Sequence, residues 1–436
     1  MVKFYKKILN NNLLLTGSIT YYFAFITMII MPVYHRFLPP FMILWGVLWL
    51  FDIRTWTRGI TRIKSQHKIL FIIFIIFFAW QIFGMLYSDN PKEGWRNIEL
   101  RLSLLLFPLV LISPGDMIKR KISTLLRLFA ISTFSYLLIC YGYAFYRSLD
   151  FQNGILTFNP YLPVYTWLNY FYGLEFAIFQ HPSYLSMYAL LSVFIAFESF
   201  FDRSVSKNQR YFWFVIGIIL LVSMYFLSSR AGILAAIILV PFYLFRKFRM
   251  KGENRYLGIG IFGGILILLP ILLTNPRVNN YLKWRSGKEL NNMIIKEDRI
   301  TIWNTVNNIL KQNIVFGVGT GDIQDELNKE YVKTGNTRLA EDNFNAHNQY
   351  IEVILENGLI GLVLFLLLFG VMFYISISER NIIYMMFLFI VLFSFLFETM
   401  LNRLAGVSFF SLFSFLLIHI NMNEQPMPAD TQKTQD

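Results

Sequence analysis

The sequence is poor in cysteine and in charge, and both shortages narrow the classes of protein to which it can belong. Its single cysteine, Cys140, lies inside an apolar run, which excludes an intrachain disulfide, a CxxC metal site and a haem-attachment motif. Charged residues make up 15% of the 436 residues, against about 25% in an ordinary soluble domain. No repeat with a period of about 20 to 50 residues is visible either. The low charge content excludes a soluble chain of two or three domains.

The sequence is rich in apolar residues: hydrophobic side chains account for 56% of the chain and aromatic ones for 18%. Lys3, Lys6 and Lys7 precede the first apolar run, and no small-residue cleavage site follows it, which predicts a retained first span. The runs predict an all-α polytopic membrane protein with about twelve transmembrane helices. The predicted spans lie near residues 17–34, 37–53, 69–87, 100–114, 122–146, 183–201, 211–229, 231–245, 257–274, 350–377, 383–400 and 406–421.

The excess of basic residues, +13 in net charge, predicts the orientation of these spans. With the N-terminus in the cytoplasm, 22 of the 39 Lys and Arg residues lie on the cytoplasmic side. Seven lie in or beside the short outer segments, and ten lie in one long outer loop. Because long loops count little in the positive-inside rule, both termini are predicted to be cytoplasmic. The charge therefore indicates topology, and nucleic acid is not an expected partner.

Four regions follow from this topology. Residues 1–274 hold the first nine spans, residues 275–349 form a large periplasmic loop, residues 350–421 hold the last three spans, and residues 422–436 form a disordered tail. In the loop, DRITIWNTVNNILKQN predicts an amphipathic helix with Arg299 in its first turn, capped by Asp298 and ended by Gly317. Its apolar face consists of Ile302, Val306, Ile309 and Leu310, widened by Trp303. The following GVGTGD lacks the GK[ST] ending of a phosphate loop and favours a helix-ending turn.

Several polar residues lie at the outer ends of the predicted spans. Arg230, in SSRAG, occupies a tight outer hairpin, and His347 ends the long loop. Arg230 could simply be an arginine that snorkels to the membrane interface, and His347 an interfacial anchor. Ionisable residues at these positions are, however, also functional candidates. Further candidate substrate-binding residues on the same face are His181, Asn348, Tyr350, Glu398 and Arg403.

Alternatives stay open for some of these residues. His181 precedes Pro182 and is also suited to cap the sixth span. Glu398 and Arg403 bracket the last outer turn and are predicted to pair with each other. At the start of the tenth span, Glu352 and Glu356 are one helical turn apart and are predicted to face the same way just below the membrane surface. Gly358 and Gly361 loosen that helix or permit close packing.

Two arginines and one histidine on one face suit transfer of a sugar from a lipid pyrophosphate. The pyrophosphate is a good leaving group that needs charge neutralisation, which arginine supplies through bidentate contacts. The acceptor hydroxyl needs a base that titrates near neutrality, and histidine is the natural choice. The paired carboxylates of glycoside hydrolysis are not required.

The order SSRAG, DRITIW, GVGTGD and NAHNQYIEVILENGLIGL resembles the O-antigen ligase and polymerase superfamily, over roughly residues 180–375. The resemblance implies a helical fold of the GT-C type at the bacterial inner membrane, with its site facing the periplasm. It implies an inverting glycosyl transfer without metal or cofactor, from an undecaprenyl-pyrophosphate-linked glycan. In this family two arginines and a histidine serve donor and acceptor, and they correspond to Arg230, Arg299 and His347.

The acceptor is the open question. One dominant late loop favours a ligase that uses a lipid A core, whereas residues 147–182 leave room for the two-loop pattern of a polymerase. A protein O-oligosaccharyltransferase of the same superfamily is a further alternative. A transporter or flippase of lipid-linked glycans is the alternative of a different class, and it predicts ionisable residues deep inside the spans. Convergence of Arg230, Arg299 and His347 around one outward-opening cavity would favour the enzyme.

Overall fold

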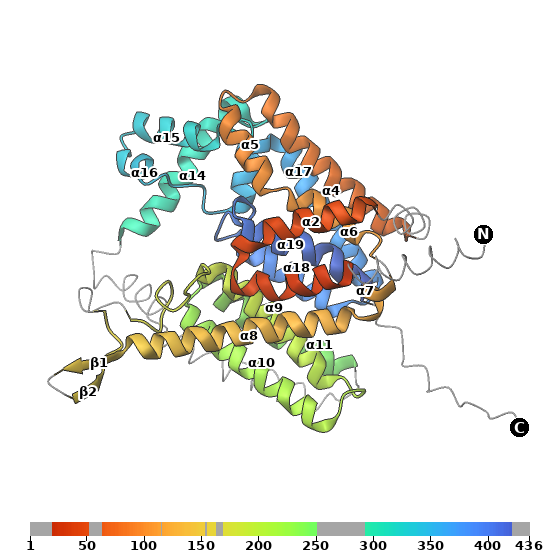
Figure 1. Cartoon of the computed structure of the whole chain (residues 1–436). Coiled ribbons are helices and arrows are strands. Elements are labelled where there is room, and N and C mark those ends of the chain that lie inside the picture. Colours follow the sequence, from red (N-terminus) through yellow and green to blue (C-terminus); the bar gives the residue numbers. More distant parts are fainter. Residues whose placement is uncertain are drawn as a thin grey trace, which may run out of the picture.

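The computed structural model describes residues 20–51, 63–114, 116–152, 155–162, 169–250 and 293–420 (Figure 1). Six helices in this part of the chain are long and apolar enough to cross a membrane. They are α4 (Ser65–Phe83, extended by η2, Gly84–Tyr87), α8 (Ile122–Arg147), α9 (Pro182–Phe201), α10 (Lys207–Leu227), α11 (Arg230–Met250) and α17 (Gln349–Ser378). Apolar runs of this length satisfy all their backbone hydrogen bonds as helices, which is what a bilayer demands.

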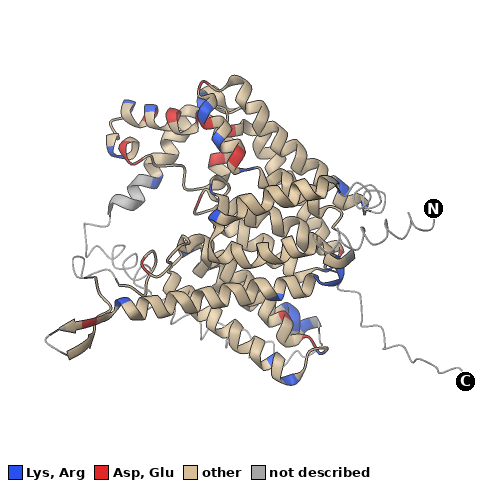
Figure 2. Ribbon diagram, viewed as in Figure 1, with Lys and Arg blue, Asp and Glu red and all other residues tan. Residues whose placement is uncertain are grey.

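Shorter apolar helices complete the bundle. They are Thr20–Val33, α2 (Leu38–Phe51), α6 (Ser103–Leu111), α18 (Ile382–Phe395) and α19 (Leu404–Leu416, continued by η5, Leu417–His419). The polar helices α5 (Pro91–Leu100) and α7 (Asp116–Arg120) and the short turns η1 (His35–Phe37) and η4 (Met400–Asn402) connect them. In Figure 2 the bundle is mostly uncharged, and charged residues gather towards its ends. The helices fit a polytopic membrane protein.

The predicted spans agree with these helices to different degrees. Most coincide within several residues, and the ninth, residues 257–274, lies outside the described residues. The fourth is too long in the prediction, because α6 has only nine residues. At 1.5 Å per residue it extends about 14 Å, less than half of a hydrocarbon core of about 30 Å. Twelve crossings therefore remain a prediction.

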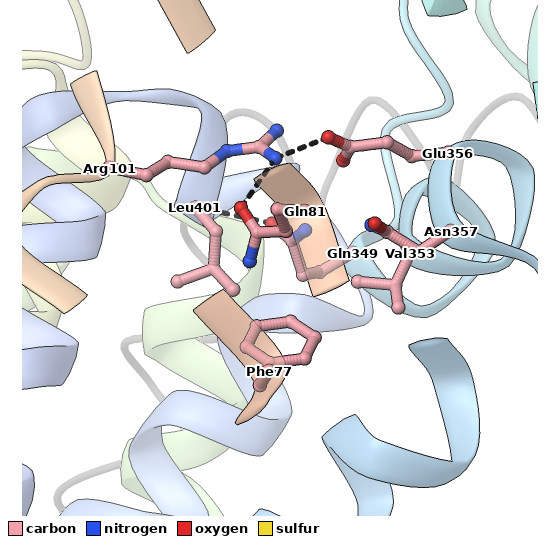
Figure 3. A pocket seen from close by; sticks show the side chains of 8 residues that line it. All are labelled: Phe77, Gln81, Arg101, Gln349, Val353, Glu356, Asn357 and Leu401. Atoms are coloured by element: carbon pink, nitrogen blue, oxygen red, sulfur yellow. Dashed lines mark hydrogen bonds and ion pairs between the residues drawn. The ribbon is translucent and has the colours of Figure 1, made fainter. Parts of the chain in front are cut away.

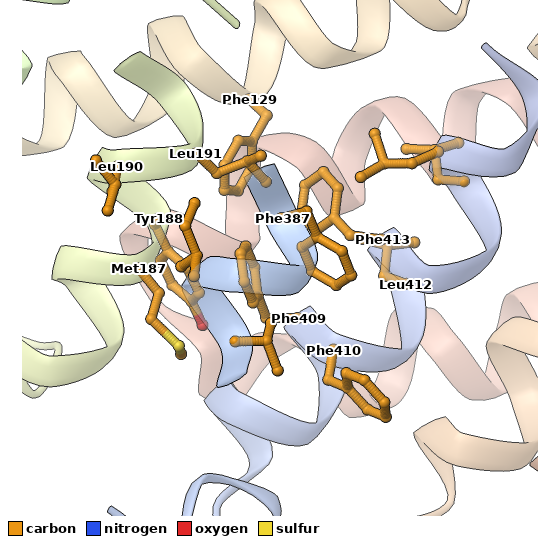
Figure 4. Packing of buried hydrophobic residues seen from close by; sticks show 14 of the residues in the cluster. Phe129, Met187, Tyr188, Leu190, Leu191, Phe387, Phe409, Phe410, Leu412 and Phe413 are labelled. Atoms are coloured by element: carbon orange, nitrogen blue, oxygen red, sulfur yellow. The ribbon is translucent and has the colours of Figure 1, made fainter. Parts of the chain in front are cut away.

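The centre of the bundle is an aromatic core between α8, α9, α18 and α19 (Figure 4). The most apolar stretch of α9 is 78% buried, against 33% for α4, so α9 is central and α4 peripheral. The rings of Phe129 and Phe413 meet edge to face at 4.9 Å, and Phe409 lies 4.9 Å from both Tyr188 and Phe413. In a bilayer such close packing, rather than release of water, holds helices together.

A β-hairpin departs from the predicted all-α class. β1 (Leu149–Gln152) and β2 (Ile155–Phe158) pair antiparallel, with Leu149 opposite Phe158, and project beyond the end of α8 (Figure 1). In the part of the chain that the structure describes, the fold is therefore helical with one small hairpin, which lies within segment 147–182, predicted to be outer.

The described part of the large loop forms a small helical unit with a core of its own. It contains α14 (Met293–Asn313), α15 (Ile323–Lys333) and α16 (Thr337–Glu341). The predicted face of α14 is confirmed for Ile302, Val306 and Ile309, which are buried, and for Leu310, which packs against them, whereas Trp303 is 39% exposed. The predicted boundaries are wrong: the helix begins at Met293 rather than beside Asp298, so Arg299 lies in its second turn. It ends at Asn313, and the N–H of Gly317 donates to the Asn313 carbonyl at 2.8 Å, so Gly317 lies in the turn that follows the helix.

Candidate functional site

The candidate residues come from four separate helix beginnings at one end of the bundle. His181 caps α9, Arg230 opens α11, His347 precedes α17 and Arg403 directly precedes α19. Because α10 joins α9 to α11 with a short connection at each end, His181 and Arg230 stand at the same end. Contacts with the α18–α19 connection bring the other elements to this point.

Glu398, in that connection, is the centre of the cluster. Its Oε2 lies 3.5 Å from Nδ1 of His347, and both side chains are partly exposed. Burial acts to raise the pKa of Glu398, but the hydrogen bond and charge of His347, followed by the charges of His181 and Arg299, outweigh it and lower that pKa. Glu398 is therefore an anion that faces three basic side chains.

The two candidate arginines lie within electrostatic range of each other. Arg299 donates from Nη2 to the carbonyl of Phe397 at 3.2 Å, and its guanidinium lies 5.9 Å from the Phe397 ring centroid. Burial lowers the pKa of Arg299, Glu398 raises it, and the charge of Arg230 lowers it further. Arg230 is exposed at the first position of α11. Two neighbouring guanidinium groups, one of them exposed, form a place for a multivalent anion.

The turn that carries His347 is held by its own neighbours. His347 has a left-handed backbone, with φ of 47°, and its N–H donates to Oδ1 of Asn345 at 3.0 Å. A positive φ is uncommon outside glycine, and such conformations cluster at functional sites. The N–H of Ala346 donates to Oε2 of Glu352 at 3.3 Å. The imidazole is thereby fixed at the start of α17 and faces Glu398.

Asn348 and Tyr350 are engaged in contacts within the protein. Oδ1 of Asn348 accepts from the N–H groups of Tyr350 and Ile351 at 2.9 and 3.2 Å, which caps α17. Its Nδ2 donates to the carbonyl of Leu396 at 3.4 Å. The Tyr350 hydroxyl donates to the carbonyl of Leu392 at 3.3 Å. These contacts position the start of α17 beside the end of α18, and substrate binding by Asn348 and Tyr350 stays a prediction.

His181 and Arg403 complete the set. Nδ1 of His181 accepts from the N–H of Ser183 at 3.3 Å, which confirms the capping interpretation. The predicted pairing of Glu398 with Arg403 is wrong: Glu398 pairs with His347, and Arg403 is exposed at the start of α19. The prediction chose the nearest cation in sequence, whereas the fold brings one from another helix. Tyr184 lies in electrostatic range of both Glu398 and Arg403.

A buried polar network beneath this cluster was not predicted (Figure 3). Arg101, 3% exposed, forms an ion pair with Glu356, 1% exposed. Arg101 also donates to Oε1 of Gln81 at 3.0 Å and to Oδ1 of Asn402 at 2.6 Å. The sequence signal for this network is Arg101, a cation directly before an apolar run. A cation inside a membrane is costly unless it is paired.

This network reaches the turn of His347. Nδ2 of Asn402 donates to Oε1 of Glu352 at 2.6 Å, and the other oxygen of Glu352 holds the N–H of Ala346. Glu352 and Glu356 are both buried in the protein, and their predicted position just below the membrane surface stays a prediction. We infer that Arg101 and the two carboxylates fix the turn between Ala346 and Asn348 through Asn402.

The glycine-rich GVGTGD segment is a turn packed against a kink in α17. The N–H groups of Val318 and Gly319 donate to the carbonyls of Leu355 and Glu356, at 2.8 and 3.0 Å. Gly358, with φ of 66° and ψ of −167°, makes the kink. A Cβ on Gly358 would lie 2.1 Å from the carbonyl oxygen of Val315. Because two of the loop's N–H groups already serve α17, the helix-ending turn is the better interpretation and a phosphate cradle is not supported.

Within the described residues, no group of three or more His, Cys, Asp or Glu side chains is arranged to hold a metal ion. The outward-opening cavity expected around Arg230, Arg299 and His347 stays a prediction. The structure does bring His347 and Arg299 to Glu398, and Arg230 lies in electrostatic range of Arg299.

Comparison with known proteins agrees with the resemblance seen in the sequence. Residues 215–366 match the model of a family described as O-antigen ligase, whose description implies a ligase-type glycosyl transfer. The match runs from α10 through α11 and the large loop into α17, and it contains Arg230, Arg299 and His347. A Haemophilus influenzae protein, described as an uncharacterized protein, is 23% identical over 369 residues, covering 82% of this chain and 84% of the relative.

Proposed function

We propose that the protein is a glycosyltransferase of the O-antigen ligase type, which moves a glycan from an undecaprenyl-pyrophosphate carrier to a lipid A core. The observation that carries the proposal is that His347 and Arg299 meet at Glu398, with Arg230 in electrostatic range of Arg299. Arg230, Arg299 and His347 all lie inside the stretch that matches the ligase family. A histidine–carboxylate pair beside two arginines matches the needs of transfer from a lipid pyrophosphate.

His347 acts as the general base in this proposal. It takes the proton of the acceptor hydroxyl while the acceptor oxygen attacks the anomeric carbon of the donor sugar. The bond between that carbon and the pyrophosphate oxygen breaks, and undecaprenyl pyrophosphate leaves with the bonding pair. Attack opposite the leaving group inverts the anomeric centre, in a reaction proposed to need no metal. Glu398, 3.5 Å away, orients the imidazole and stabilises its positive charge once it holds the proton.

Arg230 and Arg299 hold the pyrophosphate and neutralise the charge that develops on it. Arg299 is fixed by the Phe397 carbonyl and ring, so its guanidinium needs little ordering when the donor binds. Arg230, exposed at the start of α11, is free to approach the second phosphate. His181 and Arg403, on the same rim, are proposed to contact the glycan or the acceptor.

The proposed topology places this end of the bundle in the periplasm, with twelve spans and both termini in the cytoplasm. It is supported by the basic residues at the opposite helix ends, which include Arg203, Lys207, Lys247 and Arg380. The bilayer is then the route by which both lipid-linked substrates arrive. The four predicted regions, including a periplasmic loop over residues 275–349, belong to the same proposal.

The transporter alternative expects ionisable residues deep between helices, and Arg101, Glu352 and Glu356 are such residues. They form a closed network of paired groups that ends at the turn of His347, which favours a supporting role beneath a site. A polymerase would use the same residues on a lipid-linked acceptor, so only the product separates it from a ligase.

The test is deletion of the gene followed by complementation with His347→Ala and Arg230→Ala, reading lipopolysaccharide ladders on a gel. Arg203→Ala is the matched control, because Arg203 is also an exposed arginine but lies between α9 and α10, at the opposite end. All variants are compared at equal membrane levels.

A ligase predicts core without attached glycan, and accumulation of polymerised lipid-linked chains, in both site variants and not in the control. Core that carries a single repeat would instead identify a polymerase. Normal ladders in both site variants would refute the site, and loss of lipid-linked glycan from the periplasmic leaflet would favour the transporter.

A further inference from the structure

A second candidate binding site lies at the other end of the bundle, between the end of α11 and the α17–α18 turn. A cavity of about 540 Å³ is lined there by Phe242, Phe245, Arg246, Arg249, Ile377 and Arg380. It is of the size of small-molecule pockets, which measure roughly 300–1,000 Å³. The 30 residues of α17 separate it from His347, a distance of about 45 Å at 1.5 Å per residue.

The three arginines are not neutralised by the carboxylates beside them. Within the described ranges, no ion pair joins Arg246, Arg249 or Arg380 to a carboxylate. Arg246 is half-buried, and its Nη1 contacts the weak acceptor Sδ of Met385 at 3.6 Å. Three guanidinium groups therefore face one cavity with their capacity for anions unused.

The nearby carboxylates already serve other partners. Glu198 pairs with Lys247 at 2.5 Å and accepts from the Tyr243 hydroxyl at 2.9 Å. Glu379, directly before Arg380, accepts from Lys64 at 2.6 Å, and also from Gln66 and His67, at 2.8 and 3.0 Å. These two acidic residues cannot turn towards the cavity without breaking established contacts.

The rest of the cavity wall is apolar and open to the lipid side. Phe242 is 39% exposed and Ile377 is 61% exposed, and both belong to helices that are long and apolar enough to cross a membrane. A cationic rim above an exposed apolar wall matches a phospholipid, whose phosphate lies above its acyl chains. A soluble anion would leave the apolar wall unused.

We propose that this cavity binds the headgroup of an anionic phospholipid in the leaflet opposite the transfer site. Arg246, Arg249 and Arg380 contact the headgroup phosphate, while Phe242 and Ile377 pack against the first acyl carbons. Basic pockets between transmembrane helices on the cytoplasmic side are suited to anionic headgroups. The positive-inside rule accounts for cations at this end, but it does not require three of them to share one cavity.

The experiment uses the full-length protein in detergent, titrated with dioleoyl-phosphatidylglycerol or dioleoyl-phosphatidylcholine and followed by native mass spectrometry. The variant is R246Q/R249Q/R380Q. The matched control, R120Q/R203Q/K207Q, removes three exposed or partly exposed cations from the same end of the bundle. R249Q/R380Q, which keeps the half-buried Arg246, serves if the triple variant does not fold.

We expect the parent and the control to retain one phosphatidylglycerol in preference to phosphatidylcholine. Affinity should fall roughly fivefold for each arginine removed, and about a hundredfold for all three. Equal retention of the two lipids, or equal losses in the variant and the control, would overturn the proposal. Displacement of the lipid by millimolar inorganic phosphate would overturn it too, since it would identify a free anion as the ligand.

Discussion

The buried pair of Arg101 and Glu356 gives the sharpest test of the packing around the candidate site. Replacing Arg101 by Met fills similar volume but leaves the carboxylate of Glu356 buried without its cation. Breaking such a pair costs about 3–5 kcal/mol, and the variant also loses the contacts to Gln81 and Asn402. That free energy corresponds to a loss of roughly a hundredfold to several thousandfold in the folding equilibrium.

The assay is a double-mutant cycle of Arg101→Met and Glu356→Leu, with the free energy of unfolding measured by SDS titration in mixed micelles. Each single variant leaves one member of the pair without its partner, whereas the double variant removes both. The double variant should therefore be more stable than the sum of the single losses predicts, by about 3 kcal/mol or more. Additive losses, within about 0.5 kcal/mol, would show that the two residues are not coupled and refute the buried pair.

Three further predictions concern the site and its supports. Glu398→Gln removes the anion beside His347 but keeps the shape of the side chain. The transfer rate should therefore fall, though by less than the roughly 10²–10⁴-fold expected for His347→Gln. An unchanged rate in the purified variant would show that Glu398 does not assist the transfer. Gly358→Ala should destabilise the protein by about 1–3 kcal/mol or more, because its backbone conformation is accessible to glycine alone. The control is Gly370→Ala in the same helix, where the added Cβ would have no other atom within 4 Å. In thermal melts this control should be neutral or mildly stabilising. Burial acts to raise the pKa of Glu379, but its contacts with His67 and Lys64 outweigh burial and lower that pKa to about 2. These contacts therefore stabilise the fold above the ordinary pKa of 4.5, and the stabilisation is lost as the pH falls towards 2. Glu379→Gln should be less stable than the parent at pH 7, and a deficit in stability that does not shrink below pH 4.5 would contradict the prediction.

The sequence was sufficient for the helices because long apolar runs have few alternatives in a bilayer. The runs at 122–146, 183–201 and 350–377 predicted α8, α9 and α17 within a few residues. The hairpin was missed although Asn153-Gly154, a dipeptide typical of tight hairpin turns, stands between its strands in the sequence. The fourth span was overestimated because apolar residues, Leu100, Leu102 and Ile112, continue beyond both ends of α6.

The sequence offered the candidate residues, whose role stays a prediction, but it did not predict their pairings. Arg230, Arg299 and His347 carry a recognisable order of motifs, and the fold brings them together. The partner of Glu398 comes from another helix start, and the partner of Arg101 is 255 positions away. Such pairings depend on how helices pack, and a single sequence contains no periodic signal for them.

The central claim is that His347, assisted by Glu398 and the two arginines, transfers a glycan from a lipid pyrophosphate. The most direct measurement is reconstitution of the purified protein with an undecaprenyl-pyrophosphate-linked glycan and a lipid A core acceptor, following the glycosylated core. The parent should form product with inversion at the anomeric carbon, and His347→Ala should form almost none while still retaining the donor. Equal product from the parent and His347→Ala, or none from a folded parent supplied with both substrates, would contradict the account.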